Sequence, residues 1–304
     1  MDFLRLLEGI RTPVVSMFMS LITYCGDEIF FMALAITVFW CINKRDGYYI
    51  FIVGFLGTVG NQFLKLLFRI PRPWVLDPDF TIVESARAAA SGYSFPSGHT
   101  QNIVGTMSCV SLMTKQKIIR ITAISLMILV PFSRMYLGCH TPLDVGVSFI
   151  LAIILAFALR PMIIKSEQKP RLLWVLLFLS LAVVLLYLVF VTFYNFPADI
   201  DAGNLYSGMK NAYTLSGCLV GFIVAKALDD RFIHFQVEAV WWAQILKTVL
   251  GLILVVAIRA GLKAPLQAVM PEYPATALRY FLMVLFAGAI WPLTFSWFAK
   301  MGKK

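Results

Sequence analysis

The chain has 304 residues, of which 60% are hydrophobic and only 14% are charged, and its formal net charge is +10. Soluble globular domains carry roughly 25% charged residues, so this composition excludes an ordinary soluble domain. The mean hydropathy of +0.82 and several apolar runs of about 20 residues, the length needed to cross a bilayer, predict a polytopic membrane protein. The basic residues lie in short loops between apolar runs and not in an aromatic-interleaved patch, so nucleic acid is not expected as a partner.

Residues 1–24 are expected to form a separate interfacial or short membrane segment. Arg5, Glu8 and Arg11 interrupt any apolar core that a signal peptide would need, so residues 1–11 predict a short interfacial helix. Residues 12–23 are apolar but too short to span a bilayer alone. Nine membrane spans are predicted after them, at residues 27–42, 48–68, 99–114, 118–137, 142–160, 171–194, 212–228, 241–259 and 277–298.

The expected fold class is all-α, a polytopic bundle of membrane helices, because only helices satisfy their backbone in lipid without closing a barrel. In the second span, the stretch "GFLGTVG" places Gly54, Gly57 and Gly60 at every third position. A nucleotide-binding loop is a possible reading of these glycines. Their position in mid-span favours close helix packing instead.

Three polar motifs interrupt the apolar sequence, each at the end of a predicted span. In "KLLFRIPRP", Lys65 lies about two helical turns from Arg72, so both side chains could face one pocket, and the prolines beside Arg72 end the helix. In "FPSGHT", Ser97 is expected to cap the next helix. The amides of Gly98 and His99 would then be unpaired donors at a helix N-terminus, which favours phosphate binding.

The third motif, "SRMYLGCHTPLDV", joins two predicted spans. Arg134 closes the first span, while Thr141 and Pro142 are expected to be the N-cap and first residue of the next helix. His140 precedes that helix, with Asp144 near enough to orient its imidazole. This motif therefore places a cation, a histidine and a carboxylate in a strongly apolar region, where ionisable residues usually line a polar cavity.

The predicted spans alternate in direction, so all three motifs fall on the same membrane face. Taken singly, each motif has a structural explanation: snorkelling cations, a helix cap, or a structural hydrogen bond. Together they indicate phosphoryl transfer through a phosphohistidine, because cations and helix ends bind an anion, one histidine can attack and the other can donate a proton. No carboxylate cluster accompanies them, so no metal or other cofactor is expected.

These motifs resemble those of the type 2 phosphatidic acid phosphatase family. Lys65-x6-Arg72-Pro73, Pro96-Ser97-Gly98-His99 and Ser133-Arg134-x5-His140-x3-Asp144 match its three signatures in order and without a departure. The resemblance, which covers residues 25–160, implies a metal-independent lipid phosphate phosphatase with a six-helix core. It assigns His140 as nucleophile, Asp144 as its orienting partner and His99 as general acid, with the phosphate held by Lys65, Arg72, Ser97, Gly98 and Arg134.

The expected organisation is an N-terminal segment over residues 1–24, a catalytic core over 25–165 and additional transmembrane helices over 166–304, the first of which completes the bundle. The favoured function is hydrolysis of a lipid phosphomonoester or pyrophosphate, with undecaprenyl pyrophosphate as the favoured substrate. Phosphatidic acid, phosphatidylglycerol phosphate and a sphingoid phosphate are alternatives, because extra C-terminal spans also occur in sphingosine-phosphate phosphatases. A non-catalytic phospholipid transporter or scramblase is more remote, since the sequence shows no paired half-repeats.

The distribution of positive charge predicts which side the motifs face. One side, reached by residues 43–47, collects Lys44, Arg45, Lys115, Lys117, Arg120, Arg160, Lys165, Lys169, Arg171, Lys226, Arg231, Lys300, Lys303 and Lys304. Apart from the motif cations, the other side has Arg69, Arg87, Lys210, Arg259, Lys263 and Arg279. The positive-inside rule makes the first side cytoplasmic, so the site is expected to open to the extracytoplasmic side of a bacterial inner membrane. The expected partners are the phosphorylated lipid and membrane lipids, and the sequence leaves the oligomeric state open.

Overall fold

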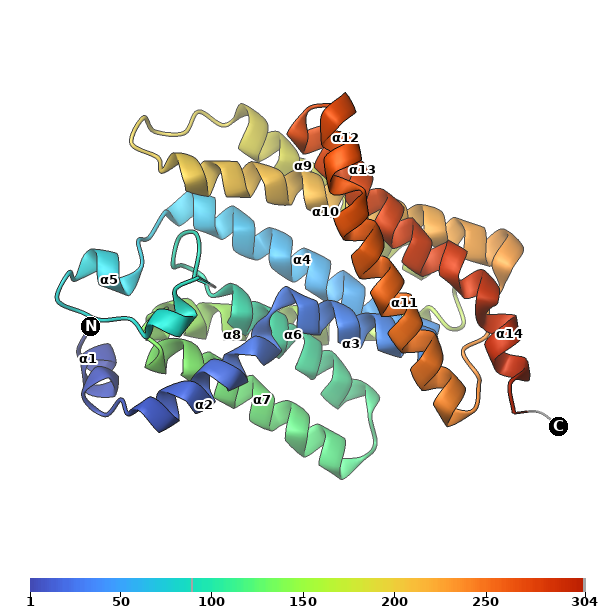
Figure 1. The fold of residues 1–304 in the computed structure, drawn as a ribbon, viewed down its shortest axis with the longest axis horizontal. Coiled ribbons are helices and arrows are strands. Elements are labelled where there is room, and N and C mark those ends of the chain that lie inside the picture. The colour runs from blue at the N-terminus through green and yellow to red at the C-terminus, as the bar shows by residue number, and fades with distance from the viewer. Residues whose placement is uncertain (89, 303–304) are drawn as a thin grey trace. The chain divides into compact units, whose positions relative to one another are not determined.

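The computed structural model describes residues 1–88 and 90–302, a part of the chain that is helical and contains no strand (Figure 1). The α-helices are α1 (Asp2–Gly9), α2 (Pro13–Thr23), α3 (Glu28–Cys41), α4 (Lys44–Phe68), α5 (Pro73–Leu76), α6 (Gly98–Met113), α7 (Lys117–Tyr136), α8 (Pro142–Lys165), α9 (Arg171–Phe193), α10 (Ala202–Leu228), α11 (Trp241–Gly261), α12 (Lys263–Val269), α13 (Glu272–Leu285) and α14 (Phe295–Lys300). Short 3-10 or π turns connect some of them: η1 (Tyr24–Gly26), η2 (Glu84–Ala86), η3 (Asp229–Ile233), η4 (Phe286–Ile290) and η5 (Trp291–Thr294). The all-α prediction is confirmed.

The described residues hold seven helical segments that are long and apolar enough to cross a membrane, or eight if one bent pair is counted as a span. The nine predicted spans therefore include two that do not qualify alone. The helix at the predicted span 99–114 has 16 residues, or about 24 Å, which is shorter than the roughly 30 Å hydrocarbon core. The helix at 27–42 has 14 residues and qualifies only together with α2. The chain is a multi-pass membrane protein.

The bent pair joins residues 12–23, which were expected to be too short to span alone, to the first predicted span. α2 and α3 meet at an angle of 49° across Asp27, whose extended backbone interrupts the helix after η1. Thr12 caps α2 and Pro13 occupies its first turn, so this helix has a regular N-terminus. The bend leaves irregular backbone in an otherwise helical region, and such backbone is tolerated at membrane depth where protein buries it.

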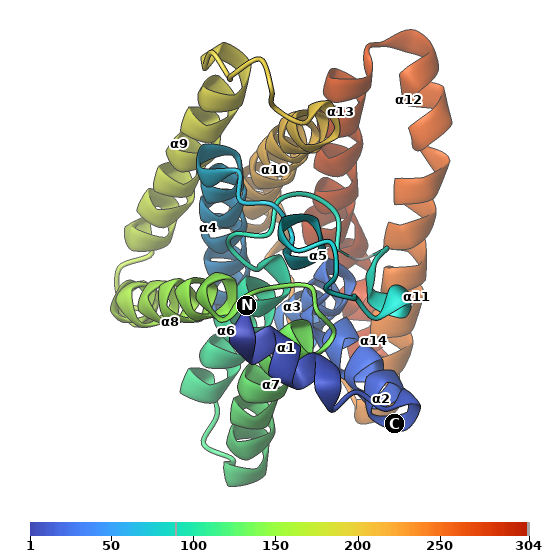
Figure 2. The same cartoon turned by 90° about the vertical axis from the view of Figure 1, so that its left-hand side faces the viewer.

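The chain forms two compact units, each assembled from separate stretches. The first contains Met1–Met32, Val53–Ile164 and Phe196–Gly208, and the second contains Ala33–Ile52, Lys165–Asn195 and Met209–Lys304. In the first unit, α6 packs against α7, its antiparallel neighbour across the short 114–116 connection (Figure 2). α1 and α2 also pack against α7. All three motifs lie in this unit.

The N-terminal segment is fixed to the long loop between α4 and α6 (Figure 1). Arg5 pairs with Asp77 at 2.6 Å, and the Arg11 guanidinium donates to the carbonyl oxygens of Thr81 and Tyr136. Gly138 follows the end of α7 and has φ +84°, and a Cβ at this position would lie 2.9 Å from the Thr81 carbonyl oxygen. Residues 1–11 therefore lie beside the loop that carries part of the first motif.

The glycines of "GFLGTVG" are mostly packing residues. A Cβ on Gly54 would collide with the ring of Phe31, and one on Gly57 would collide with the side chain of Gln101 in α6. Gly60 has no atom within 4 Å of its Cβ position and contributes nothing to this contact. The packing interpretation therefore holds at two of the three positions.

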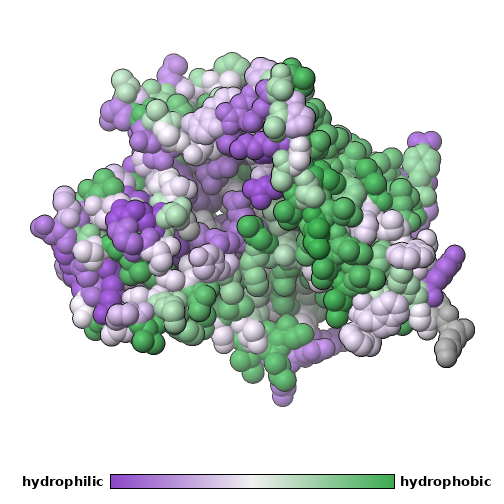
Figure 3. Space-filling model, viewed as in Figure 1, coloured by the Kyte–Doolittle hydropathy of each residue, from purple (hydrophilic) through white to green (hydrophobic). Residues whose placement is uncertain are grey.

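The second unit is built around α11 and a cluster of aromatic rings. α11 packs against α13 and α14, and its outer face is apolar, with Ile245 and Val256 more than half exposed (Figure 3). Lys247 is buried on the inner face of α11 and donates to the carbonyl oxygens of Trp40 (2.9 Å) and Val237 (3.1 Å). This lysine satisfies a carbonyl at the end of α3 that the helix itself leaves unpaired.

Candidate active site

The first motif is positioned by the end of α4. Lys65 stands in the last turn of this helix, is buried, and donates from Nζ to the carbonyl oxygen of Tyr93. The helix ends at Phe68, and Arg69 adopts the left-handed conformation with φ 50°. Arg72 therefore reaches the site from a turn, as the N-cap residue of α5, and not from the helical face of Lys65 as the spacing suggested.

Arg72 is buried, and its guanidinium group joins the first motif to the third. Nη1 lies 2.9 Å from His140 Nε2 and donates to the carbonyl oxygen of Cys139 at 3.0 Å. The other nitrogens donate to the carbonyl oxygens of Ser91 (2.7 Å) and Gly92 (2.9 Å). These four contacts hold the planar guanidinium in one orientation beside the histidine.

The second motif begins α6 as predicted. Ser97 is the N-cap, and its Oγ accepts from the Thr100 amide at 3.4 Å. Gly98 and His99 are then the first two helical residues, whose amides have no carbonyl partner within the helix. The Ser97 amide donates to the Asp144 carbonyl oxygen at 3.1 Å, which fixes this helix start against the first turn of α8.

The third motif is held by a reciprocal cap at the start of α8. The Thr141 amide donates to Asp144 Oδ2 at 2.7 Å, and the Asp144 amide donates to Thr141 Oγ1 at 3.3 Å. Asp144 Oδ2 also lies 3.6 Å from His140 Nδ1, which is an ion-pair distance but longer than a hydrogen bond. Ser94 bridges the two, since its Oγ donates to Asp144 Oδ2 at 2.6 Å and lies 3.5 Å from His140 Nδ1.

The partners of His140 define its tautomer. Arg72 can only donate, so His140 Nε2 must accept, and the ring proton resides on Nδ1, facing Ser94 and Asp144. Burial, and then the positive charges of Arg72 and Arg134, lower the pKa of His140 well below its usual range. The imidazole is therefore neutral near pH 7, with its lone pair on the nitrogen that faces Arg72.

Arg134 is the most deeply buried cation of the site. Its side chain is fully buried, and Nη1 donates to Thr23 Oγ1 at 3.0 Å. Its Nε and Nη2 atoms have no hydrogen-bond partner among the residues that the structure describes. Buried guanidinium donors without partners are costly, and these two nitrogens could donate to an anionic ligand.

The structure thus brings the eight residues predicted from the motifs into one unit, and it adds others that the sequence did not single out. Ser94 and Tyr93 lie just ahead of the second motif and contact Asp144 and Lys65, respectively. Asp27, in the break between α2 and α3, places Oδ1 2.8 Å from His99 Nε2. Ser94 and Tyr93 could have been suspected from their closeness to the motif, whereas nothing in the sequence pairs Asp27 with a histidine 72 positions later.

Comparison with known proteins identifies the family. The pattern of the PAP2 superfamily matches residues 46–168, which contain all three motifs. A second pattern, described as the transmembrane extension of PAP2 superfamily phosphatases, matches residues 213–303. The chain belongs to the PAP2 superfamily. The resemblance predicted from the motifs is confirmed, and the helices of the second unit from residue 213 onward correspond to the PAP2 transmembrane extension.

Three curated relatives of this PAP2 protein act on lipid phosphates, according to their names. A probable sphingosine-1-phosphate phosphatase of Dictyostelium discoideum is 28% identical, over 48% of this chain and 38% of the relative. The undecaprenyl-diphosphatase BcrC of Bacillus subtilis (strain 168) is 30% identical, over 41% of this chain and 64% of the relative. Phosphatidylglycerophosphatase B of the same organism is 28% identical, over 50% of this chain and 76% of the relative. The match spans less than two thirds of the length of the first two relatives.

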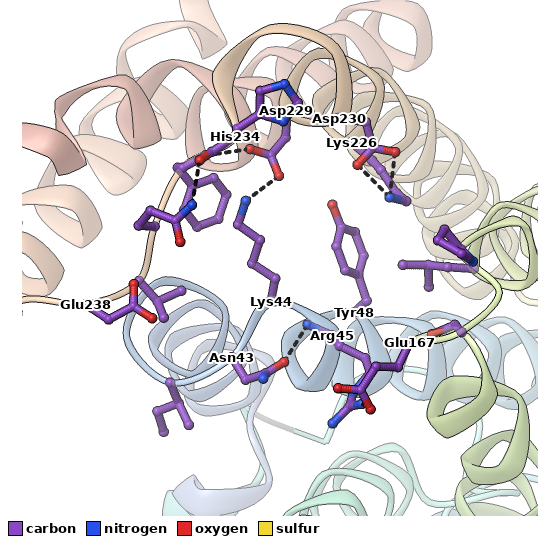
Figure 4. Close-up of a pocket in the computed structure, with 17 residues that line it drawn as sticks. Asn43, Lys44, Arg45, Tyr48, Glu167, Lys226, Asp229, Asp230, His234 and Glu238 are labelled. Atoms are coloured by element: carbon purple, nitrogen blue, oxygen red, sulfur yellow. Dashed lines mark hydrogen bonds and ion pairs between the residues drawn. The ribbon is translucent and has the colours of Figure 1, made fainter.

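The second unit contains a polar cavity of about 550 Å³, lined by the first turn of α4, the turn after α8 and the end of α10 (Figure 4). His234, exposed and in the left-handed conformation, also lines it. Three cations of the cavity are each paired with a carboxylate: Lys44 with Asp229 (2.6 Å), Arg45 with Glu167 (2.5 Å) and Lys226 with Asp230 (2.8 Å). The cavity therefore has as many paired carboxylates as cations, whereas at the motif site three buried cations accompany the buried carboxylate of Asp144.

Proposed function

We propose that this PAP2 protein is a membrane phosphatase that hydrolyses a lipid phosphomonoester or pyrophosphate through a phosphohistidine intermediate. The observation that carries the proposal is the contact of Arg72 with His140 Nε2 at 2.9 Å, because it places a cation and a nucleophilic lone pair at the same point. A phosphoryl group bound to Arg72 would therefore meet the nitrogen that attacks it. Lys65, Arg134, Ser97 and the amide of Gly98 would hold the remaining phosphoryl oxygens.

The reaction proceeds in two displacements. In the first, the Nε2 lone pair of His140 attacks phosphorus, the P–O bond to the lipid breaks, and His99 gives a proton to the departing oxygen. Water then attacks the phosphohistidine, the P–N bond breaks, His99 takes the proton of the water, and inorganic phosphate leaves. Asp144, directly and through Ser94, holds the Nδ1–H of His140 and stabilises the positive ring that forms.

The proposed chemistry is independent of a divalent metal. Lys65, Arg72 and Arg134 supply the positive charge that phosphoryl transfer requires, and all three are buried, where charge stabilisation is strongest. Addition of EDTA should leave the turnover of the purified protein unchanged. Loss of activity in EDTA that added metal restores would contradict this part of the proposal.

The favoured substrate is undecaprenyl pyrophosphate, in which case the leaving group is the lipid monophosphate. The name of one relative supports this choice, and the names of the other two support a sphingoid phosphate or phosphatidylglycerol phosphate as alternatives. Phosphate release from a panel of these lipids in detergent, with glucose 6-phosphate for comparison, ranks the candidates. Faster cleavage of glucose 6-phosphate than of every lipid would refute a lipid substrate.

The proposed site opens away from the cytoplasm, on the side with fewer cations. The test places single cysteines in the 70–97 and 160–171 loops of a cysteine-free variant and labels intact cells with an impermeant maleimide. Labelling at 70–97 alone is expected. Labelling at 160–171 alone would reverse the orientation and remove the role in recycling a lipid carrier.

The mechanism is tested by comparing variants of the nucleophile and its partner. His140→Ala should lose all measurable turnover, and vanadate, a phosphoryl mimic, should inhibit the wild-type protein. Asp144→Asn should retain more activity than His140→Ala, because it removes the orienting charge but leaves the nucleophile. Full activity of His140→Ala would overturn the proposed function.

A further inference from the structure

The break between α2 and α3 contacts two residues of the candidate site, although it lies outside the residues 46–168 that match the PAP2 pattern. Thr23 Oγ1 accepts from Nη1 of the buried Arg134 at 3.0 Å. Asp27 Oδ1 lies 2.8 Å from His99 Nε2, and both side chains are shielded, with 31% and 15% of their surface exposed. Asp27 and His99 form an ion pair when the imidazole is protonated, and the ring N–H is not aligned for a hydrogen bond.

The backbone of the break is fitted closely to the start of α6. A Cβ on Gly26 would lie 2.9 Å from His99 Cβ and 3.1 Å from the His99 carbonyl oxygen, so a larger residue would push the two segments apart. The Asn102 side chain donates to the Gly26 carbonyl oxygen at 3.3 Å, one turn further along α6. The position of Asp27 beside His99 is therefore built into the packing of the break.

We propose that Asp27 is a positioning residue for His99, which extends the site beyond the three family motifs; this inference rests on the proposed function. A general acid must carry its proton when the substrate binds. Burial, and then Arg134 and Arg72, oppose a positive charge on His99, and Asp27 is the carboxylate that acts in the opposite direction among the described groups around this ring. Its charge stabilises the imidazolium, as an adjacent carboxylate does in catalytic triads.

The arrangement also selects which nitrogen of His99 exchanges the proton. Because Nε2 faces Asp27, Nδ1 is the nitrogen that gives its proton to the lipid oxygen as the P–O bond breaks. In the second displacement, Nδ1 takes the proton of the attacking water as the P–N bond breaks. Asp27 remains ionised throughout and transfers no proton.

The test compares Asp27→Asn and Asp27→Glu with Glu84→Gln, a matched control in the same unit whose carboxylate is 75% exposed and pairs with Arg87. Asp27→Asn should lower kcat on a lipid phosphate by about 10- to 100-fold, within the usual contribution of general acid catalysis, with a smaller effect on KM. The alkaline limb of its pH–rate profile should move to lower pH, because the imidazolium is less stabilised. Asp27→Glu should restore part of the rate, and Glu84→Gln should match the wild type.

A second substrate separates a positioning role from a structural one. p-Nitrophenyl phosphate has a leaving group that needs no proton, so Asp27→Asn should lose less activity on it than on the lipid phosphate. Equal losses on both substrates with an unchanged pH profile, or no loss on the lipid, would overturn the inference. His140→Ala is measured in parallel: if it is inactive while Asp27→Asn is unaffected, only the role of Asp27 fails, whereas an active His140→Ala refutes the proposed function itself.

Discussion

Replacement of Arg134 by methionine should remove activity without destabilising the protein. The arginine is fully buried and donates from Nη1 to Thr23, while within the described part of the chain its Nε and Nη2 atoms have no partner. If these two nitrogens donate to the phosphoryl group, their loss removes two charge-assisted bonds of about 1.5–3 kcal/mol each. The sum of about 3–6 kcal/mol corresponds to a fall in kcat/KM of about 10²- to 10⁴-fold, since every 1.4 kcal/mol is tenfold.

The same substitution should leave the melting temperature unchanged or raise it. A buried charge carries a desolvation penalty, and even buried ion pairs can often be replaced by apolar residues of similar volume at no cost or with a gain of about 1–4 kcal/mol, so we expect the same direction for this arginine. The assay combines phosphate release with thermal unfolding of the purified protein in detergent. Arg87→Met, at an exposed position of the loop between α4 and α6, serves as the control and should change neither quantity. A clear fall in melting temperature for Arg134→Met, or activity within threefold of the wild type, would refute the reasoning.

Three further outcomes follow from the geometry. Ser94→Ala removes a 2.6 Å donor to Asp144 and should lower kcat by about tenfold, the equivalent of a charged hydrogen bond of about 1.5 kcal/mol; kcat equal to the wild type would exclude the bridging role. The lowered pKa of His140 keeps its lone pair available as the pH falls. The acidic limb of the pH profile of kcat/KM should therefore have its midpoint below about pH 6.5, the usual pKa of a histidine. A midpoint above that value would contradict a buried neutral nucleophile. Gly138→Ala, at φ +84°, should lower the free energy of unfolding by at least about 1–2 kcal/mol. Gly60→Ala, inside α4 with open space at its Cβ position, should be neutral or stabilising by up to about 1 kcal/mol. Thermal unfolding measures both, and the reverse order would contradict the described backbone.

The elements of the site that depend on local sequence were predictable. The hydroxyl oxygens of Ser97 and Thr141 each accept a hydrogen bond from the amide three residues later, and such local helix caps can be predicted from sequence. The clustering of the motifs on one face also followed from alternating spans. A contact such as that between Arg72 and His140 was implied by the shared face, but the tautomer it sets required the atomic positions.

Other features could not be read from the sequence because they depend on where distant segments meet. The contact of Asp27 with His99 depends on a bend at η1 that the hydropathy pattern does not reveal, since α2 and α3 are both apolar. The predicted end of the second span at residue 68 agrees with the end of α4 at Phe68, but the turn that carries Arg72 to the N-cap of α5 was not evident from its spacing to Lys65. The docking of residues 1–11 on residues 77–81 arises from a long-range ion pair and a hydrogen bond to a backbone carbonyl, for which the sequence offers many possible partners.

The division of the first unit into three stretches has a consequence for biosynthesis. The unit consists of residues 1–32, 53–164 and 196–208, so translation must pass residue 208 before the unit is complete. Until Arg134 is translated, Thr23 lacks the guanidinium that donates to its hydroxyl oxygen. Domains generally fold as units during synthesis, and incomplete ones expose apolar surface, so the nascent chain can misassemble in the interval before residues 196–208 are made.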